Sequence, residues 1–398
     1  MTIDDKALRL PAFLFKPVKM SYAFRYRAHR RALEEIIRNN RPTTPGARPG
    51  PLIIFPPSLN WHSQLFQRPQ QLAVALAKQG ALVFYIQAVN RTRATAENPN
   101  LRLEQISERL YLCSIPVGAF WFLKNPITYL LTWNAKYIAA FSSPRVIYDV
   151  VDEIQAFEGN PDQMIRRHQE LLQRAEWVLT TAERLYKKVQ QVRRDVILCP
   201  NGVDYDFFYQ TKDQTTTPPP DILPILALNK PIIGYYGALA HWFDFDLLKA
   251  VANMRNDLSF ILIGPEIDGS LQQSQALQLP NIHWLGVRSY MQIPQYLRCF
   301  DAAMIPFHLN DVTHATSPLK LFEYMAGGRP VVITAMEESL RFPGVIVANE
   351  PADFAHKLDQ ALQLRFDHNY LQLIDQVAQH NTWEIRAQQI FKALAMGT

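Results

Sequence analysis

Residues 313–334, THATSPLKLFEYMAGGRPVVIT, place a helix start, a helix stop and an apolar strand within one short stretch. Ser317 is a favourable N-cap, Pro318 suits the first helical position, and Gly327 with the glycine that follows it ends the helix. The pattern therefore predicts a helix over about residues 318–326, followed directly by a buried strand. A helix that leads straight into an apolar strand is typical of parallel α/β sheets.

The first turn of this helix has the features of an anion site. Its free backbone N–H groups and the positive end of the helix dipole favour an anion, and Lys320 adds a full charge that the dipole alone would disfavour. Glu323 lies three residues further on nearly the same face, so a carboxylate acceptor is expected beside the phosphate site, where a pair of sugar hydroxyls would suit it. The alternative is a Lys–Glu pair on a solvated amphipathic helix.

The composition is that of a globular protein. The chain has 398 residues, 48% hydrophobic and 19% charged, which allows two or three domains. Its three cysteines, Cys113, Cys199 and Cys299, are too widely spaced for a metal knuckle or a redox pair, so we expect a reducing cytoplasm. We find no leader pattern and no uncharged run of the ~20 residues that span a bilayer, and we expect a protein that is neither secreted nor membrane-spanning.

Positive charge is concentrated at the N-terminus. Residues 1–50 hold eleven Lys or Arg against four Asp or Glu, a net charge of +7, whereas the whole chain carries +5. The same segment contains the aromatic residues Phe13, Phe15, Tyr22, Phe24 and Tyr26. This mixture favours peripheral contact with the anionic inner face of a membrane, or alternatively a solvated helix packed on the first domain. We expect no nucleic-acid partner, because no helix-turn-helix, zinc or single-strand-binding signature accompanies the charge.

From residue 51 onward, short apolar runs alternate with helical patterns. One parallel sheet is predicted by PLIIF, ALVFYIQ, VIYDVV, WVLTTA and VILCP, and a second by PIIGYYG, SFILIGP, IHWLG, AAMIPF, PVVIT and VIVA. The polar, proline-rich segment 210–224 is expected to be a loop or linker. The sequence thus predicts two Rossmann-like α/β domains, at 51–204 and 205–381, with the C-terminal helix 382–398 crossing back onto the first.

The apolar stretch LYLCSIPVGAFWFL, residues 110–123, allows two interpretations. It is a segment of buried core, or it adds an anchoring patch for a membrane surface.

A resemblance to a known family rests on motifs from both halves. The second half resembles the donor domain of GT-B glycosyltransferases, closest to glycosyltransferase family 4, in IGYYGAL, FILIGP, NIHWLGVRSYMQIPQYLRCFDAAMIPF and SPLKLFEYMAGGRPVV. The first half is similar to the bacterial branch with teichuronic acid biosynthesis enzymes, in NWHSQLFQRPQQLAVALA, IYDVVDE and CPNGVDYDFF. The likeness covers roughly residues 51–398. It implies a GT-B fold, two Rossmann-like domains that face each other across a cleft.

The resemblance also implies a reaction. A sugar would pass from a nucleoside diphosphate sugar, the co-substrate in place of any cofactor, to a hydroxyl of a glycan or lipid-linked acceptor in bacterial polysaccharide or glycoconjugate synthesis, with retained anomeric configuration. By similarity, Lys320 would neutralise the diphosphate and Glu323 would bind the ribose. The other expected donor-binding residues are Gly237, Arg288, Thr316, Ser317, Pro318 and Leu319.

The donor side departs from the family at two places. Many members carry a glutamate eight positions before Glu323, where this chain has Ala315, and we expect His314 or Thr316 to contact the donor sugar instead. Many relatives also place an Arg and a Lys after the strand PIIGYYG, where this chain has GALAHWFDFDLL.

The catalytic carboxylates come from the strand VIYDVVDE. The histidine that many relatives carry near its end corresponds to Val151, and the acidic residues that remain there are Asp149 and Asp152. We expect both to be catalytic together with Lys320, because α/β proteins bind ligands at the carboxyl ends of strands. A helix-capping Asp152 is the alternative.

The acceptor side is expected to include Trp61, Gln67 and Arg68, which follow the first strand. Asp244 and Asp246 form an Asp-x-Asp pair that could bind a metal, but their place at a helix start favours capping by Asp244 and a metal-independent enzyme.

Three other functions remain open from the sequence alone. The first is an inverting transferase with Asp152 as base, the second is a GT-B nucleotide-sugar epimerase, and the third is a non-catalytic GT-B partner subunit.

Overall fold

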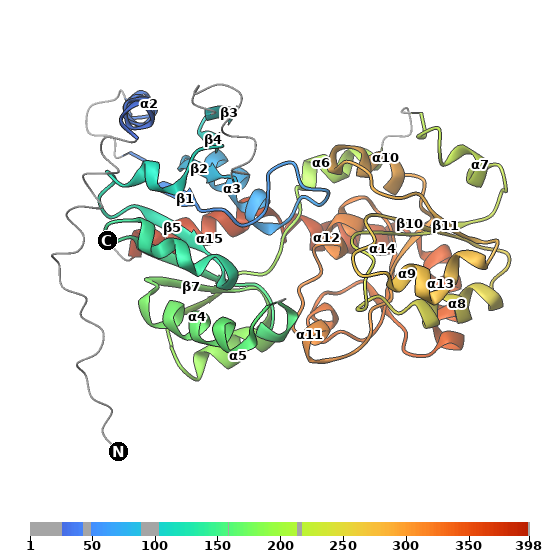
Figure 1. Ribbon diagram of the computed structural model, residues 1–398. Coiled ribbons are helices and arrows are strands. Elements are labelled where there is room, and N and C mark those ends of the chain that lie inside the picture. Colours follow the sequence, from blue (N-terminus) through green and yellow to red (C-terminus); the bar gives the residue numbers. More distant parts are fainter. Residues whose placement is uncertain (1–25, 43–48, 89–102, 158, 213–216, 397–398) are drawn as a thin grey trace, which may run out of the picture.

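The computed structural model describes residues 26–42, 49–88, 103–157, 159–212 and 217–396 (Figure 1). They form two α/β domains side by side, each built on one mainly parallel sheet. The predicted α/β class, with two Rossmann-like domains, is therefore confirmed.

The first sheet has the strand order β3-β4-β2-β1-β5-β6-β7-β8, and its pairs are parallel except for β3–β4. Its strands are β1 (Leu52–Phe55), β2 (Leu82–Ile86), β3 (Leu103–Ser107), β4 (Leu110–Cys113), β5 (Ile127–Leu130), β6 (Arg145–Val150), β7 (Trp177–Thr180) and β8 (Val196–Leu198). The helical segments of this domain are α2 (Arg27–Asn39), α3 (Arg68–Lys78), η2 (Val117–Phe120), η3 (Thr132–Ala140), η4 (Ile154–Ala156), α4 (Pro161–Arg174) and α5 (Glu183–Gln190).

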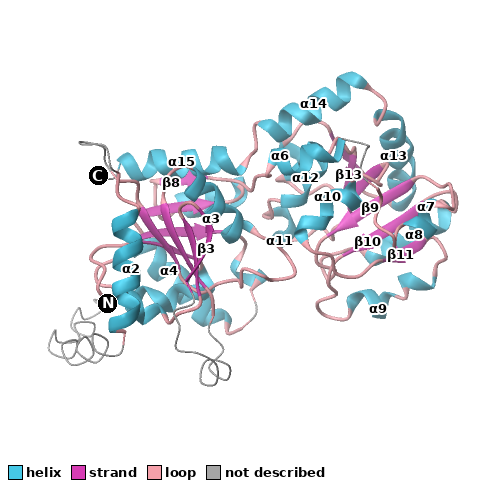
Figure 2. Cartoon of the chain, turned by 90° about the horizontal axis from the view of Figure 1, so that it is seen from above, coloured by secondary structure: helices cyan, strands magenta, loops and turns pink. Residues whose placement is uncertain are grey.

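Alternation along the strands gives this sheet two apolar faces. In β1, Ile53 faces a core that includes α3 and the C-terminal helix α15 (Trp383–Met396), whereas Ile54 faces the core shared with α2 and η2. In β6, Ile147 belongs to the first of these cores, and Tyr148 packs with α4 and α5. Helices therefore cover both faces (Figure 2).

The second sheet is wholly parallel, with the order β11-β10-β9-β12-β13-β14. Its strands are β9 (Ile232–Tyr236), β10 (Ser259–Ile263), β11 (Ile282–Trp284), β12 (Ala302–Ile305), β13 (Val331–Ile333) and β14 (Val345–Val347). The helical segments are α6 (Tyr205–Tyr209), η5 (Gln210–Lys212), α7 (Leu223–Leu226), α8 (Phe245–Met254), α9 (Ser270–Ser274), η6 (Ala276–Gln278), η7 (Tyr290–Gln292), α10 (Ile293–Leu297), α11 (Asp311–His314), α12 (Leu319–Ala326), η8 (Ser339–Arg341), α13 (Pro351–Leu364) and α14 (His368–Gln379).

Every strand that the sequence predicted is present, but β3, β4 and β5 were missed. β5 lies directly after Pro126 and is separated from η3 only by Leu131, so no turn signal marks its end. β3 lies at the sheet edge, and its sequence, LEQIS, has only two apolar residues and no regular alternation. The segment 210–224 was predicted to be irregular and contains η5 and the start of α7; its residues 213–216 lie outside the described residues.

The chain crosses between the domains twice. Val203 and Thr382 form a parallel bridge where the two crossings meet. Beyond it, α15 packs on α3, and the Trp177 indole N–H donates to the carbonyl oxygen of Ala393 at 3.0 Å (Figure 2). The C-terminal helix thus completes the core of the first domain.

The described part of the basic N-terminal segment is a helix packed on the first domain. Leu33 of α2 is fully buried with Phe120, and the guanidinium of Arg30 lies 5.6 Å from the ring centroid of Trp121. Residues 110–123 supply much of this core, so they form buried core and not an anchoring patch. Within the described residues, no helix is long and apolar enough to cross a membrane. Membrane contact stays a prediction, and its aromatic residues lie outside the described residues, apart from the buried Tyr26.

Candidate active site

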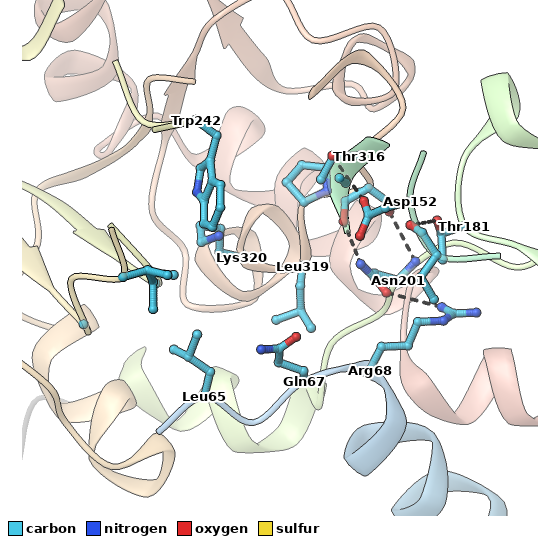
Figure 3. Close-up of a pocket in the computed structure, with 18 of the residues that line it drawn as sticks. Leu65, Gln67, Arg68, Asp152, Thr181, Asn201, Trp242, Thr316, Leu319 and Lys320 are labelled. Carbon is cyan, nitrogen blue, oxygen red and sulfur yellow. Dashed lines mark hydrogen bonds between the residues drawn. The ribbon is translucent and has the colours of Figure 1, made fainter. Parts of the chain in front are cut away.

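A cavity of about 1230 Å³ lies between the two domains (Figure 3). Its walls are the loops that follow β1, β5, β6, β7 and β8 in the first domain and β9, β10, β11 and β12 in the second, together with the start of α12. These are carboxyl ends of parallel strands, where α/β proteins bind ligands. Both sheets therefore direct their ligand-binding edges at one shared space.

Lys320 lies in the first turn of α12 and lines this cavity. Its Nζ lies 5.3 Å from the ring centroids of Tyr235 and Phe307, and the described residues give it no hydrogen bond or ion pair. Burial lowers the pKa of Lys320 to about 8. Lys320 is thus a cation without a hydrogen-bonded counter-charge, at the positive end of a helix, and a bound anion would supply that charge.

Gly237, the residue after β9, makes room for this lysine. Its φ of 142° lies in the region that side chains rarely adopt, and a Cβ there would lie 2.7 Å from Cε of Lys320. A larger residue would displace the lysine and narrow the cavity.

Glu323 lies one turn further along α12 and is 1% exposed. Its Oε2 accepts a hydrogen bond of 2.9 Å from the Tyr236 hydroxyl, and its Oε1 lies 3.5 Å from the Tyr290 hydroxyl. Burial raises the pKa of Glu323 to about 7, although both tyrosines and the nearby Lys320 oppose the shift. The carboxylate thus lines the cavity with one firm partner and one weak one.

Tyr290 connects this carboxylate to the first domain. Gln71 of α3 donates a hydrogen bond of 2.7 Å to its hydroxyl. Its ring is stacked between Phe66 and Phe207, with centroids 5.2 Å away on each side. A ligand that displaces the Tyr290 hydroxyl from Glu323 would therefore disturb a contact between the domains.

The predicted N-cap of α12 is wrong. Pro318 is the N-cap residue, the helix begins at Leu319, and no side chain of the described residues caps it. Ser317 is bound by the first domain instead, because its carbonyl oxygen accepts a hydrogen bond of 2.6 Å from Asn201 Nδ2 and its Oγ accepts one of 3.2 Å from the Asn201 N–H. Two side chains of the first turn, Leu319 and Lys320, face the cavity (Figure 3).

Asp152 faces the same cavity from the loop after β6. Its Oδ1 lies 3.4 Å from the Thr316 hydroxyl across the cleft (Figure 3), and burial raises its pKa to about 7. Of the two residues expected to replace the missing glutamate, Thr316 lines the cavity. His314 does not, and its Nδ1 accepts a hydrogen bond from the Glu337 N–H at 3.3 Å.

Asp149, the other expected catalytic carboxylate, is fully buried and does not line the cavity. It accepts hydrogen bonds from Arg68, with Nε–Oδ2 at 2.6 Å and Nη2–Oδ1 at 3.1 Å, and from the Tyr129 hydroxyl. Burial alone would lower the pKa of Arg68, but Asp149 raises it. Nη1 of Arg68 also donates to the carbonyl oxygen of Pro200 at 3.0 Å and to Oδ1 of Asn201 at 3.3 Å. The pair therefore joins α3 and β6 to the segment at Pro200 and Asn201 beside the cavity.

The expected acceptor residues separate in the structure. Gln67 and Arg68 line the cavity, as Figure 3 shows, whereas Trp61 does not. The Trp61 ring packs on Tyr85 and Phe66, with centroid distances of 5.1 and 5.3 Å. Trp61 is therefore part of the loop's own packing.

Arg288 lines the cavity but its charge is already paired. The guanidinium forms an ion pair with Asp221, and its Nε donates to the Tyr296 hydroxyl at 2.8 Å. A phosphate would have to compete with Asp221 for this cation.

The Asp-x-Asp pair caps a helix. Asp244 is the N-cap of α8 and accepts a hydrogen bond of 2.8 Å from the Leu247 N–H, while Asp246 is exposed and lies 3.0 Å from Lys249 Nζ. Neither carboxylate lines the cavity, and the described residues contain no cluster of side chains that could hold a metal ion.

Sequence reasoning missed Tyr236, Tyr290 and Asn201. Tyr236 is the last residue of β9, so its position at the carboxyl end of a parallel strand was an available signal. Tyr290 and Asn201 act through residues that are distant in sequence, such as Gln71 and Ser317, and no local pattern indicates those contacts.

Comparison with known proteins identifies related sequences. Residues 230–364 match the family described as glycosyl transferases group 1. TuaH of Bacillus subtilis (strain 168), a protein assigned by name to teichuronic acid biosynthesis as a glycosyltransferase, is 27% identical over 232 residues, which are 56% of this chain and 57% of TuaH. The matching region thus spans little more than half of that relative.

Solved structures identify the fold. Sucrose-phosphate synthase from Thermosynechococcus elongatus superposes with a TM-score of 0.59 at 14% identity, covering 87% of this chain and 98% of that one. Anabaena HepE in complex with UDP and glucose gives 0.58 at 15% identity, over 86% and 99% of the two chains. An E. coli structure described as trehalose-6-phosphate bound with UDP-2-fluoro glucose superposes with a TM-score of 0.62 at 12% identity. The superposition covers 87% of this chain and 99% of that one. The chain has the GT-B glycosyltransferase fold.

The buried Arg68–Asp149 pair leads to a stability prediction. Asp149→Asn leaves the Arg68 charge buried without a counter-charge, and we expect the free energy of unfolding to fall by about 3–5 kcal/mol. Glu170→Gln, which breaks the exposed ion pair with Arg174, should lower the free energy of unfolding by less than about 1 kcal/mol. Urea unfolding followed by circular dichroism measures both. Equal effects of the two substitutions would show that the buried pair does not support the cleft.

Proposed function

We propose that this protein, whose chain has the GT-B glycosyltransferase fold, transfers a glycosyl unit from a nucleoside diphosphate sugar to the hydroxyl group of an acceptor. One observation carries the proposal. The start of α12 presents uncapped backbone, the unpaired cation of Lys320 and the buried carboxylate of Glu323 to a single cavity, one turn apart. A diphosphate followed by a ribose matches this order of charges.

The diphosphate would be stabilised most strongly as it leaves. The bond between the anomeric carbon and the diphosphate breaks, and negative charge grows on the departing phosphate oxygen. Lys320 and the first amides of α12 would surround the space where that charge develops. Groups that interact better with the transition state than with the ground state raise the turnover number.

Glu323 would bind the ribose. An ionised carboxylate accepts hydrogen bonds from two neighbouring hydroxyls, and its Oε1 is the more available oxygen because the Tyr290 hydroxyl lies 3.5 Å away. Tyr236 would keep its bond to Oε2 and hold the carboxylate in place. Complexes of HepE with UDP and with UDP-glucose support a uridine nucleotide as the first donor to test.

Asp152 would act on the acceptor side. Its carboxylate faces the cavity opposite Thr316, and a pKa of about 7 suits a group that accepts a proton from the attacking hydroxyl near neutral pH. Direct displacement with Asp152 as base would invert the anomeric configuration, whereas the family resemblance implies retention. The product's anomeric proton coupling distinguishes the two courses.

The similarity to TuaH supports a role in bacterial polysaccharide synthesis. With a nucleotide-sugar as donor, the growing glycan or its lipid-linked form would be the acceptor. Lys320 and the amides of α12 would carry the electrostatic stabilisation that a metal ion supplies in other transferases.

Substitutions in α12 should separate binding from turnover. Glu323→Ala should raise the KM for the nucleotide-sugar by about tenfold, because the ribose loses its acceptor. Lys320→Ala should lower kcat by about 10²-fold, because the lysine acts on charge that grows in the transition state. Steady-state kinetics measure both, with Asp246→Ala on the exposed turn of α8 as the control. Unchanged kinetics in both α12 variants would show that Glu323 does not bind the ribose and that Lys320 does not stabilise the leaving diphosphate.

The pH dependence of nucleotide binding follows from the two shifted groups. Glu323 must be ionised to accept hydroxyls, so affinity for UDP should rise as the pH increases through about 7. Lys320 must be protonated, so affinity should fall as the pH increases past about 8. Isothermal titration from pH 5.5 to about 9.5 should give a maximum between these values.

Lys320→Arg provides the control for the alkaline limb, because a guanidinium stays protonated throughout this range. The fall above pH 8 should disappear in this variant and the rise near pH 7 should remain. An alkaline limb that is identical in both proteins would assign it to another group.

Activity should survive exhaustive dialysis against EDTA, because Lys320 and the helix amides perform the electrostatic stabilisation. Initial rates before and after treatment, with a metal-dependent transferase treated in parallel, measure this. Complete loss of activity that Mn²⁺ or Mg²⁺ restores would contradict metal independence.

A further inference from the structure

The wall of the cavity on the first-domain side is aromatic and apolar. It includes Leu131, Trp133, Val151, Phe157 and Met164, from η3, the loops after β5 and β6, and α4. The rings of Trp133 and Phe157 are 5.0 Å apart between centroids, with an interplanar angle of 58°, and both remain half-buried. This wall lies opposite the proposed donor site at the start of α12.

The backbone at Trp133 is tied to neighbouring segments by hydrogen bonds. Its neighbour Asn134 is 2% exposed, accepts a hydrogen bond of 2.8 Å from the Leu131 N–H and donates one of 3.4 Å to the carbonyl oxygen of Pro56. These bonds tie η3 to the loop after β1. A preformed aromatic surface loses little conformational entropy when it binds a ligand.

Charge on this wall is negative or absent. Among the described first-domain residues that line the cavity, the ionisable ones are Arg68 and Asp152. The positive charge of Arg68 is neutralised by Asp149 in the interior. An anionic acceptor would therefore meet the Asp152 carboxylate and no available cation.

The basic side chains of the opposite wall do not change this. Arg288 is paired with Asp221, and the imidazole of His241 is hydrogen-bonded to Asp268 at 2.9 Å. Among the described residues that line the cavity, this leaves Lys320, and the proposed diphosphate would occupy it.

Amide side chains lie on the same wall as the aromatic pair. Gln64 and Gln155 line the cavity, are exposed, and have no hydrogen-bond partner among the described residues. A primary amide donates and accepts hydrogen bonds, as sugar hydroxyls do. A hydrocarbon chain on this wall would offer neither amide a hydrogen-bond partner, and it would cover the Asp152 carboxylate.

We propose that this wall is the acceptor site and that it binds an uncharged sugar ring, stacked on Trp133 and Phe157, with Gln64 and Gln155 on its hydroxyls and one hydroxyl directed at Asp152. The inference rests on the proposed glycosyl transfer and narrows its acceptor to a neutral glycosyl unit. It excludes a sugar phosphate, and it excludes recognition through a lipid chain.

Saturation-transfer NMR on the full chain with UDP tests the class of acceptor. The probes are the methyl glycosides of glucose, galactose, mannose and N-acetylglucosamine, the 6-phosphates of the same sugars, and n-octyl glucoside below its micelle concentration. We expect saturation of the ring protons of at least one methyl glycoside, with its 6-phosphate at least about tenfold weaker. Equal binding of the phosphate, stronger saturation of the octyl chain than of the ring, or no binding of any methyl glycoside would overturn the proposal.

Variants locate the site. Trp133→Ala should weaken the glycoside that binds by about tenfold, Trp133→Phe should recover most of that loss, and Trp121→Ala, a matched substitution outside the cavity, should change nothing. Unchanged glycoside affinity in Trp133→Ala would contradict the site.

Thermal shifts with UDP on the same proteins separate this inference from the proposed function. If UDP raises the melting temperature of every variant but glycoside binding does not depend on Trp133, the acceptor-site inference is wrong and the proposed function still stands. If UDP, GDP, dTDP and ADP and their sugars all leave the wild-type melting temperature unchanged, the proposed function fails, and the acceptor inference fails with it.

Discussion

The buried ion pair between Arg68 and Asp149 is the interaction on which the geometry of the cleft depends. It joins α3 to β6 and, through the remaining Arg68 donors, fixes Pro200 and Asn201 where the chain leaves the first domain. Asn201 in turn binds Ser317, directly before α12. These hydrogen bonds connect the second domain's α12 to the first domain's sheet, and the Gln71–Tyr290 hydrogen bond is a further connection between the domains. Truncating either charge would leave the other buried without a counter-charge, which is far more costly than losing an exposed pair.

The start of α12 places two ionisable side chains at the cavity, where we propose that a nucleotide binds. Lys320 and Glu323 lie one turn apart on the cavity wall, and burial moves the pKa of the lysine down to about 8 and that of the glutamate up to about 7. Both shifts mean that the charged forms are poorly solvated, and a ligand that brings phosphate oxygens and hydroxyls to them replaces the missing water. Because Tyr290 contacts Glu323, Gln71 and Phe66, occupation of the ribose site would also be communicated to the first domain.

The sequence was sufficient wherever the determining physics is local. The α/β alternation predicted the main strands of both sheets, and the dipole argument for α12 identified Lys320 and Glu323, which the structure brings to one cavity. The N-cap assignment failed because Asn201, far away in the chain, binds Ser317. Trp61 looked available because an aromatic after a strand is ambiguous until its neighbours, here Tyr85 and Phe66, are known.

The two carboxylates after β6 illustrate the same limit. Asp149 lies two residues after Ile147 in β6, so both side chains point to the same face of the sheet. That face is covered by α3, which carries Arg68. Asp152, beyond the end of the strand, has no such constraint and reaches the cleft. Strand parity could have separated them, but the partner of Asp149 is visible only in the folded chain.

A structure of the protein bound to a nucleoside diphosphate sugar, with the donor chosen from UDP-, GDP-, dTDP- and ADP-sugars by thermal shift, would show where the diphosphate binds. We expect diphosphate oxygens within about 3 Å of the first amides of α12 and of Lys320 Nζ, with the ribose hydroxyls on Glu323. A diphosphate bound elsewhere in the cavity, with Lys320 and Glu323 untouched, would contradict this expectation.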